Sequence, residues 1–181
     1  MRVISGKYKR LELKGFDIEG IRPTMDKVKE SIFGMIQDKV RDSICLDLFS
    51  GTGSLGIEAL SNGAEYVYFV DKMKESIDIT KYNLDRIKDN NYTIVNDNYT
   101  SSLKKFNDNG IKFDIIFIDQ PYGRIKIKEV IDNILKYDIL NKDGILVCEY
   151  EKEELEENYN NLELIKYRKY GRVFINIYKS R

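Results

Sequence analysis

Residues 46–56 read LDLFSGTGSLG and link a buried strand to a helix. Gly51 and Gly53 let the backbone approach a ligand closely, and Gly56 lets the helix pack tightly on the strand. The stretch satisfies G-x-G-x-x-G, the dinucleotide-binding fingerprint. Asp71 lies 20 residues beyond Gly51, where an acid can accept hydrogen bonds from both ribose hydroxyls. The stretch therefore predicts a cofactor site at a strand-to-helix turn.

The acid before this loop discriminates between two kinds of cofactor. Asp47 stands at the strand end, four residues before Gly51, where its carboxylate would point into the space of a pyrophosphate. Like charges repel, so this position disfavours NAD, the cofactor of the competing dehydrogenase interpretation. The same carboxylate suits a ligand with an ammonium or sulfonium centre, such as S-adenosylmethionine (SAM). We therefore expect SAM, bound by Asp47, Phe49, Gly51, Thr52 and Gly53.

A second polar site follows a later apolar strand. Residues 119–122 read Asp-Gln-Pro-Tyr, and Pro121 is one of two prolines in the chain. The side chain of Asp119 and the carbonyl of Gln120 would each accept a hydrogen bond from an exocyclic NH2 group, while Tyr122 stacks on a planar base. As a bare tetrapeptide these residues can form an ordinary turn, but beside a SAM loop they indicate a catalytic site.

The strand before that one ends in a third polar cluster. Residues 96–98 read Asn-Asp-Asn. Asp97 could accept a hydrogen bond from the adenine amine of the cofactor, and Asn98 is a further candidate. Such clusters commonly just form turns, and that interpretation stays open.

Alternating strand and helix patterns around these motifs predict the fold class. Apolar runs indicate strands over 44–49, 65–70, 92–95, 113–118 and 144–149, and helical spacing indicates helices over 54–61, 72–88, 100–106 and 127–136. Five such units imply an α/β, Rossmann-like, doubly wound sheet that is mostly parallel. Residues 162–169 and 173–178 add an antiparallel C-terminal pair. We expect a single domain over 1–181, with a basic hairpin and helix at 1–40 and the cofactor-binding core at 41–181.

Composition excludes several classes of chemistry. The chain has 181 residues, no histidine and two cysteines. These counts exclude Ser-His-Asp and Cys-His catalysis and a Cys-rich zinc site, so we expect no metal. No apolar run reaches the roughly 18 residues of a membrane span, and no apolar segment follows the charged start. We therefore expect a cytoplasmic protein without a membrane partner.

The net charge of zero hides two basic ends. Residues 1–14 hold five basic residues against Glu12, and residues 165–181 hold six basic residues and no acid. Two basic ends around an acidic middle can form a face for a polyanion. Solvated lysines that protect edge strands explain the same pattern equally well.

Together these motifs resemble the class I SAM-dependent methyltransferases, and specifically the bacterial small-subunit rRNA guanine-N2 methyltransferases, the RsmD family. The resemblance spans nearly the whole chain, through RVISGKYKRLEL at 2–13, IRPTMDKVKESIF at 21–33, LDLFSGTGSLGIEAL at 46–60, DIIFIDQPYG at 114–123 and YGRVFINIY at 170–178. The combination of Arg22-Pro23-Thr24 with the glycine loop and the Asp-x-Pro-Tyr site is more specific than any single motif.

The resemblance implies methyl transfer from SAM to the exocyclic N2 of a guanine in 16S rRNA, by similarity guanine 966. The partner would be 16S rRNA, the small ribosomal subunit or its assembly intermediate, and the enzyme a monomer. Asp47, Gly51 and Gly53 would line the methionine end of SAM, Asp71 would hold the ribose, Asp97 the adenine and residues 119–122 the guanine. The implied RNA-binding residues are Arg2, Lys7, Lys9, Arg10, Arg22 and Arg172.

One position departs from the family's pattern. The family usually reads Asp-Pro-Pro-Tyr or Asp-Pro-Pro-Phe, whereas this chain has Gln120 at the second position. Gln also provides a backbone carbonyl but lacks the ring's rigidity, so we expect a working but looser site. The alternatives are an adenine-N6 or protein-glutamine methyltransferase with the same Asp-x-Pro-Tyr site, and a non-catalytic nucleotide-binding subunit.

Overall fold

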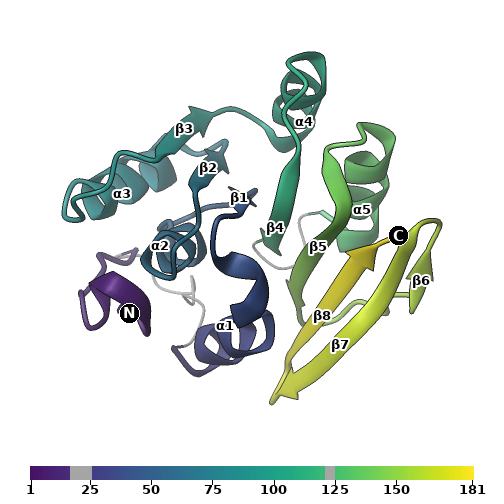
Figure 1. Cartoon of the computed structure of the whole chain (residues 1–181), viewed down its shortest axis with the longest axis horizontal. Helices are drawn as coiled ribbons and strands as arrows, with labels where there is room; N and C mark the ends of the chain where they lie inside the picture. The colour runs from purple at the N-terminus through teal and green to yellow at the C-terminus, as the bar shows by residue number, and fades with distance from the viewer. Residues whose placement is uncertain (17–25, 121–124) are drawn as a thin grey trace.

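One mixed sheet of eight strands runs through the described part of the chain, in the order β3-β2-β1-β4-β5-β8-β7-β6 (Figure 1). The computed structural model describes residues 1–16, 26–120 and 125–181. The strands are β1 (Ile44–Asp47), β2 (Tyr66–Asp71), β3 (Tyr92–Asn96), β4 (Phe113–Asp119), β5 (Leu140–Tyr150), β6 (Asn158–Tyr159), β7 (Leu162–Tyr170) and β8 (Val173–Ser180). The helices are η1 (Gly6–Tyr8), α1 (Asp26–Val40), α2 (Ser54–Ser61), α3 (Lys74–Leu84), α4 (Tyr99–Asp108) and α5 (Ile127–Lys136).

The first five strands are parallel, and their sequences explain why they are central. In β4, every residue from Ile115 to Ile118 is buried, as expected for a strand covered on both faces. β1 pairs with β2 on one side and with β4 on the other. The strand order changes direction between β1 and β4, and ligands of such sheets bind beyond the strand ends at this switch point.

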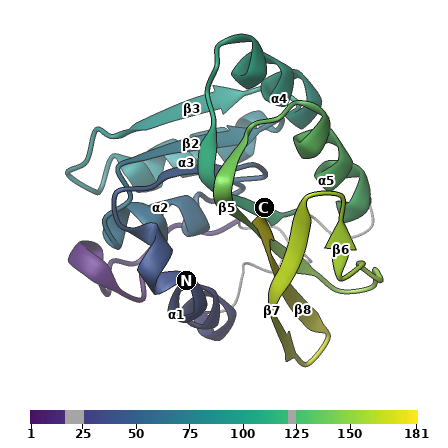
Figure 2. The same ribbon diagram turned by 45° about the vertical axis from the view of Figure 1, so that its right-hand side comes forward.

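Helices cover both faces of the sheet (Figures 1 and 2). α1, α2 and α3 pack on one face, where Ile32, Ile57 and Leu84 belong to one apolar core. α4 and α5 pack on the other face, where Leu103 and Ile131 belong to a second core. Among the described residues, no helix combines the length and the apolar character that a membrane span requires.

The predicted fold class is confirmed, with differences at the element ends. α2 and α5 have the predicted bounds, and β8 lies antiparallel to both β5 and β7. β5 begins at Leu140 rather than at residue 144, because Phe113 pairs with Leu140 across a register shift in the ladder. β6 was not predicted, since its two residues are too short to show a strand period.

The N-terminal arm, residues 1–14, differs from the predicted hairpin of two strands. Arg2 and Glu12 form a single isolated antiparallel bridge, and the short helix η1 lies between them. The N–H of Val3 donates to the carbonyl of Leu11 at 2.9 Å, so the two halves of the arm still run antiparallel. Regular pairing is limited because part of the arm's backbone bonds to α2 instead.

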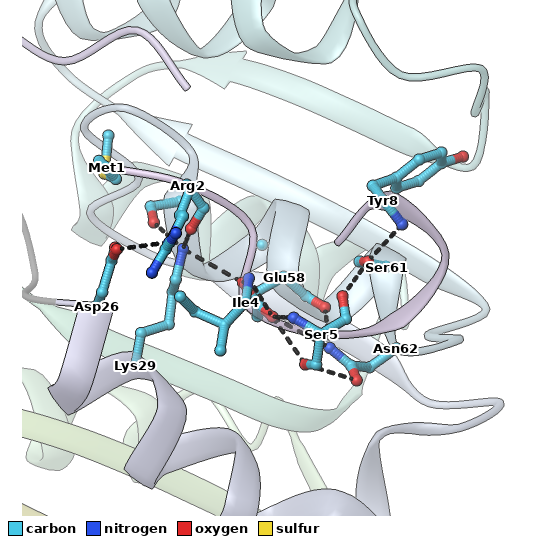
Figure 3. A network of polar contacts seen from close by, with 12 residues as sticks. Met1, Arg2, Ile4, Ser5, Tyr8, Asp26, Lys29, Glu58, Ser61 and Asn62 are labelled. Atoms are coloured by element: carbon cyan, nitrogen blue, oxygen red, sulfur yellow. Dashed lines mark hydrogen bonds and ion pairs between the residues drawn. The ribbon is translucent and has the colours of Figure 1, made fainter. Parts of the chain in front are cut away.

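Glu58 and Lys29 form a buried ion pair that joins the arm, α1 and α2 (Figure 3). Both side chains are 0% exposed, and Nζ lies 3.2 Å from Oε2. Glu58 accepts hydrogen bonds from the N–H groups of Ile4 and Ser5 at 2.9 and 2.8 Å, while Lys29 donates to the carbonyl of Arg2 at 2.6 Å. Burial lowers the pKa of Lys29, and the charge of Glu58 opposes this shift. Removing either charge would leave the other buried and unpaired, so the three segments dock together.

Gly6 marks the closest approach between the arm and α2, and it provides a test of this docking. Its φ is +75°, and an added Cβ would lie 1.9 Å from the carbonyl oxygen of Ser61. Gly110 has a similar φ of +67° but open space around it. We predict that Gly110→Ala costs only the left-handed strain of about 1–2 kcal/mol, whereas Gly6→Ala costs clearly more because the arm must separate from α2. Urea unfolding of both variants measures the difference, and equal losses would contradict the described docking.

Candidate cofactor and substrate site

The acids that were predicted to follow or end the strands lie at the carboxyl edge of the sheet. Asp47, Asp71 and Asp119 are the last residues of β1, β2 and β4, and Asp97 follows β3. Because parallel strands point the same way, these four carboxylates lie along one edge. The charges of Asp119 and Asp71 both raise the pKa of Asp47, so the structure brings these three acids together.

The loop after β1 enters α2 through a left-handed glycine. Gly53 has φ +77°, stands immediately before α2 and donates its N–H to the carbonyl of Ser50 at 2.6 Å. A Cβ on Gly53 would lie 3.0 Å from Cγ2 of Thr80. A Cβ on Gly56 would lie 2.2 Å from the ring of Phe69, which confirms the predicted tight packing of helix on strand. A side chain at either position would clash with the protein's own side chains, so both positions require glycine.

Asp47 is buried beneath this loop. It is 2% exposed, and its Oδ2 accepts a hydrogen bond from the N–H of Gly56 at 2.9 Å. Burial raises the pKa of Asp47 to about 7, the bond from Gly56 opposes the shift, and the charges of Asp119 and Asp71 add to it. A cation at this edge would offset both the burial penalty and the repulsion among the acids. The site therefore fits a ligand with a sulfonium or ammonium group better than a pyrophosphate.

Asp71 supports the loop from the neighbouring strand. Its Oδ2 accepts a hydrogen bond from the N–H of Gly51 at 3.0 Å, and its Oδ1 accepts one from the N–H of Met73 at 2.8 Å. Each carboxylate oxygen keeps a second lone pair, so this fixed side chain could also accept bonds from ribose hydroxyls. The predicted ribose contact is compatible with this geometry and stays a prediction.

Two buried polar residues of α3 support the loop, and the sequence analysis missed them. Thr80 and Asn83 are both 0% exposed and lie on one face of the helix, as does the buried Ser76. Thr80 Oγ1 donates to the carbonyl of Gly51 at 3.0 Å, and Asn83 Nδ2 donates to the carbonyl of Thr52 at 2.9 Å. Polar residues at helical spacing within a buried stripe were the signal that could have identified them.

The remaining loop residues differ in their surroundings. Phe49 packs against Tyr99 of α4, with ring centroids 5.5 Å apart. Thr52 is buried, and its Oγ1 lies 3.6 Å from the sulfur of Met1 in the arm. The buried Oγ of Ser50 has no hydrogen-bond partner among the described residues. A buried hydroxyl in that state could bond to a polar group of a ligand.

Asn98 and Asp97 have clear structural roles after β3. Asn98 caps α4, because its Oδ1 accepts a hydrogen bond from the N–H of Ser101 at 2.8 Å. Asp97 accepts bonds from Lys105 Nζ at 2.7 Å and Ser101 Oγ at 2.9 Å, and the bond from Lys105 lowers the pKa of Asp97. The turn interpretation thus applies to Asn98, while the adenine contact of Asp97 stays a prediction.

Gln120 is tied to the chain beyond the second motif. It is 4% exposed, and its Nε2 donates to the carbonyl of Ile125. Its Oε1 is buried and has no partner within the described ranges. The amide therefore supplies a fixed connection where the family has a proline ring, a feature that the sequence comparison did not anticipate. Pro121 and Tyr122 lie outside the described residues.

The predicted RNA-binding residues of the arm tip lie away from this edge. η1 packs beside the last turn of α2, where the N–H of Tyr8 donates to Ser61 Oγ at 3.0 Å. That end of α2 leads into β2, so Lys7, Lys9 and Arg10 lie near the amino edge of the sheet. Lys7 is also paired with Asp89 at 2.6 Å, which raises the pKa of Lys7.

The two basic ends of the chain do not form one continuous face. In both views the arm tip and the β7–β8 hairpin lie on opposite sides of the molecule (Figures 1 and 2). Arg172 is exposed in the turn of that hairpin, and Arg2 is paired with Asp26 at 3.2 Å. Arg22 lies outside the described residues. The ends separate because the arm docks on α2, whereas the last strand inserts beside β5.

The sheet order, the glycine loop and the edge acids define the fold of the class I methyltransferases. The solved structure of yhhF from Escherichia coli, described provisionally as a methyltransferase, aligns with a TM-score of 0.88 at 30% identity, covering 100% of this chain and 98% of that one. This likeness confirms the predicted fold class.

The chain belongs to the family described as Conserved hypothetical protein 95, whose model matches residues 1–179. YlbH of Bacillus subtilis, whose name assigns it provisionally to the rRNA methyltransferases, is 40% identical over 100% of both chains. The ribosomal RNA small subunit methyltransferase D of Haemophilus influenzae is 31% identical, covering 99% of this chain and 94% of that protein. The resemblance noted from the motifs is thus confirmed.

The burial of Asp47 predicts a pH-dependent change in stability. The unfolded group ionises near its usual value of 3.8, but the folded group ionises near 7, so wild-type stability falls as pH rises through this interval. Asp47→Asn removes that titration and can keep the bond from Gly56. We expect the stability of the variant relative to wild type to improve by a few kcal/mol between pH 5 and pH 8. Urea unfolding at both pH values measures this change, and an unchanged difference would contradict the burial of an ionisable Asp47.

Proposed function

We propose that this protein is a SAM-dependent methyltransferase that acts on the exocyclic N2 of a guanine in 16S rRNA. The observation that carries the proposal is the meeting of Asp47, Asp71 and Asp119 around a glycine loop at the switch point. The names of relatives covering almost the whole chain support small-subunit rRNA as the substrate class. Guanine 966 follows from the resemblance alone and is part of the proposal.

The cofactor end of the site would be built from the β1 loop and the end of β2. Gly51, Thr52 and Gly53 offer backbone at close range, Asp47 offers negative charge for the methionine end, and Asp71 offers acceptors for the ribose. Bound SAM would supply an electrophilic methyl group on its sulfonium. The residues present fit this ligand because Asp47 and Asp71 both bond to the glycine-loop segment, and Lys105 at the same edge is paired with Asp97.

The substrate end would work mainly by positioning. The N2 lone pair of guanine is shared with the ring, so this amine is a poor nucleophile and must be held in line. Asp119 and the main-chain carbonyl of Gln120 would accept its two hydrogens and orient it. Methylation makes the nitrogen strongly acidic, so Asp119 or water can take the released proton, and no histidine is needed.

If its free oxygen faces the substrate, the side chain of Gln120 would favour guanine over adenine. The base-pairing edge of guanine presents two neighbouring donors, N1–H and the N2 amine, whereas adenine presents one donor and one acceptor. Besides its main-chain carbonyl, Gln120 has the buried Oε1 that lacks a donor within the described chain. An adenine-N6 or protein-glutamine substrate would leave this additional acceptor without a partner.

Asp119→Ala tests the assigned role directly. We expect SAM affinity by calorimetry to stay nearly intact, while methyl transfer to rRNA falls at least roughly a hundredfold, because positioning of the amine is lost. A second variant, Gly53→Val, should lose SAM binding, because the left-handed φ of this position and the contact of a Cβ with Thr80 would force the loop to move. Tritium transfer from SAM to rRNA, DNA and release factor measures activity and substrate class together. An Asp119→Ala protein with most of its activity would exclude this carboxylate as the amine acceptor.

A further inference from the structure

Three aromatic rings lie side by side on one face of the β7–β8 hairpin and β5. The rings of Tyr150 and Phe174 are stacked, with centroids 5.4 Å apart and planes at 18°, and the ring of Tyr167 follows at 6.3 Å from Phe174. Tyr167 is 46% exposed, so the row ends in an accessible ring. Lys169 Nζ lies 5.0 Å from the centre of the Phe174 ring. An exposed ring with a cation beside it is the kind of surface on which single-stranded bases stack.

Strand register places this row at the same end of the sheet as Asp119. The rings lie on the α5 face of the sheet, whereas Asp119 belongs to the other face, because side chains alternate along a strand. Asp119 pairs with Glu149 in β5, and the following residue of β5, Tyr150, pairs with Phe174 in β8. Adjacent strands are about 4.8 Å apart, so β8 and β7 lie about 10 and 14 Å from β4. Neighbouring nucleotides of one RNA strand cover such a span. The arm tip, in contrast, lies toward the opposite edge of the sheet.

The row is held rigid from below by a chain of buried hydrogen bonds. The hydroxyl of Tyr150 donates to Asn176 Oδ1 at 2.9 Å, Asn176 Nδ2 donates to the hydroxyl of Tyr178 at 2.7 Å, and that hydroxyl donates to the carbonyl of Glu156 at 2.7 Å. Asn176 and Tyr178 are 2% and 0% exposed. Satisfied buried networks rigidify a surface, so a base that stacks here would order few side chains.

The charges on the β7–β8 hairpin beyond Leu164 complement a phosphate backbone. The exposed basic residues of the hairpin are Lys166, Arg168, Lys169 and Arg172, and residues 165–181 contain no acid. In the acidic segment that follows β5, Glu153 accepts a hydrogen bond from the N–H of Ile127 at 2.7 Å, and Glu156 is paired with Lys128 at 2.6 Å. These two carboxylates are therefore engaged within the protein.

Resting on the proposed function, we propose that the β7–β8 hairpin is a stacking platform for an unpaired nucleotide that flanks the target guanine. Tyr167 supplies the contact ring, Phe174 and Tyr150 support it, and Lys169 and Arg172 contact the neighbouring phosphates. Protection of an edge strand would explain the lysines and the arginine of β7, but it would not call for an exposed tyrosine ring beside the ring of a phenylalanine.

Binding of a short single-stranded RNA of mixed sequence to the full-length protein tests the platform without requiring turnover. We expect Tyr167→Ala to weaken binding about five- to fiftyfold and Tyr167→Phe to keep it, because a base needs the ring and not the hydroxyl. The salt dependence should be unchanged in both, since no charge is removed. Tyr137→Ala is the matched control, because Lys136 lies over that ring at 5.3 Å and Tyr137 precedes β5 at its other end; its affinity should not change.

Two double variants that remove positive charge distinguish RNA binding by the hairpin from RNA binding by the arm. Lys169→Gln with Arg172→Gln should reduce the slope of log affinity against log salt by about 1.4, at about 0.7 for each lost phosphate contact on single strands. Lys9→Gln with Arg10→Gln should change it less. If Tyr167→Ala binds RNA as tightly as wild type does, the platform is overturned. It is also overturned if the substitution changes the oligomeric state of the protein and leaves RNA affinity unchanged. Failure of methyl transfer to guanine with these binding effects present would instead overturn the proposed function alone.

Discussion

The buried contact between Lys29 and Glu58 is the constraint on which the cofactor side of the molecule depends. Glu58 belongs to the helix that follows the glycine loop, and Lys29 also donates to Ser54 Oγ at 3.0 Å, at the first residue of that helix. Neither charge has contact with solvent, so each requires the other. The pair therefore fixes the position of α2 relative to α1 and the arm, and thereby the end of the loop from which Gly53 leads into the helix.

The same segments support the loop from its other side. Asn83 accepts a hydrogen bond from the N–H of Lys14 at 2.7 Å and donates to the carbonyls of Lys14 and Thr52 at 3.0 and 2.9 Å. The arm is thus part of the scaffold of the proposed cofactor site as well as a carrier of basic residues. Substitutions at its base should be interpreted with this in mind, because they can change the loop without touching a ligand.

The acids at the sheet edge explain why this fold would select a cationic ligand. Asp47 is destabilising as a buried anion near two others, and a sulfonium would turn that repulsion into attraction. The burial of Asp47 and the repulsion among the acids destabilise the folded protein when no ligand is bound, as is common at functional sites. Rigid elements hold the acids, since three of them end strands of one sheet.

The sequence predicted the parallel sheet and the edge acids because apolar runs and strand-end positions are local signals. It did not predict that Glu58, a lone charge in an apolar helix, would pair with Lys29, since that contact joins distant segments. The buried positions of Thr80 and Asn83 could have been inferred from their helical spacing. Hydropathy alone does not indicate them, because both residues are polar. The sequence left open whether the two basic ends share one face, because composition carries no information about which elements they dock against.

The most direct test of the account is the chemical identity of the methylated product. The protein would be incubated with small-subunit rRNA, or with subunits lacking the modification, and SAM carrying an isotopically labelled methyl group. The RNA would then be digested to nucleosides and analysed by mass spectrometry. We predict label in N2-methylguanosine alone. Label in N6-methyladenosine, or RNA without label while a protein substrate is methylated, would contradict the proposed function.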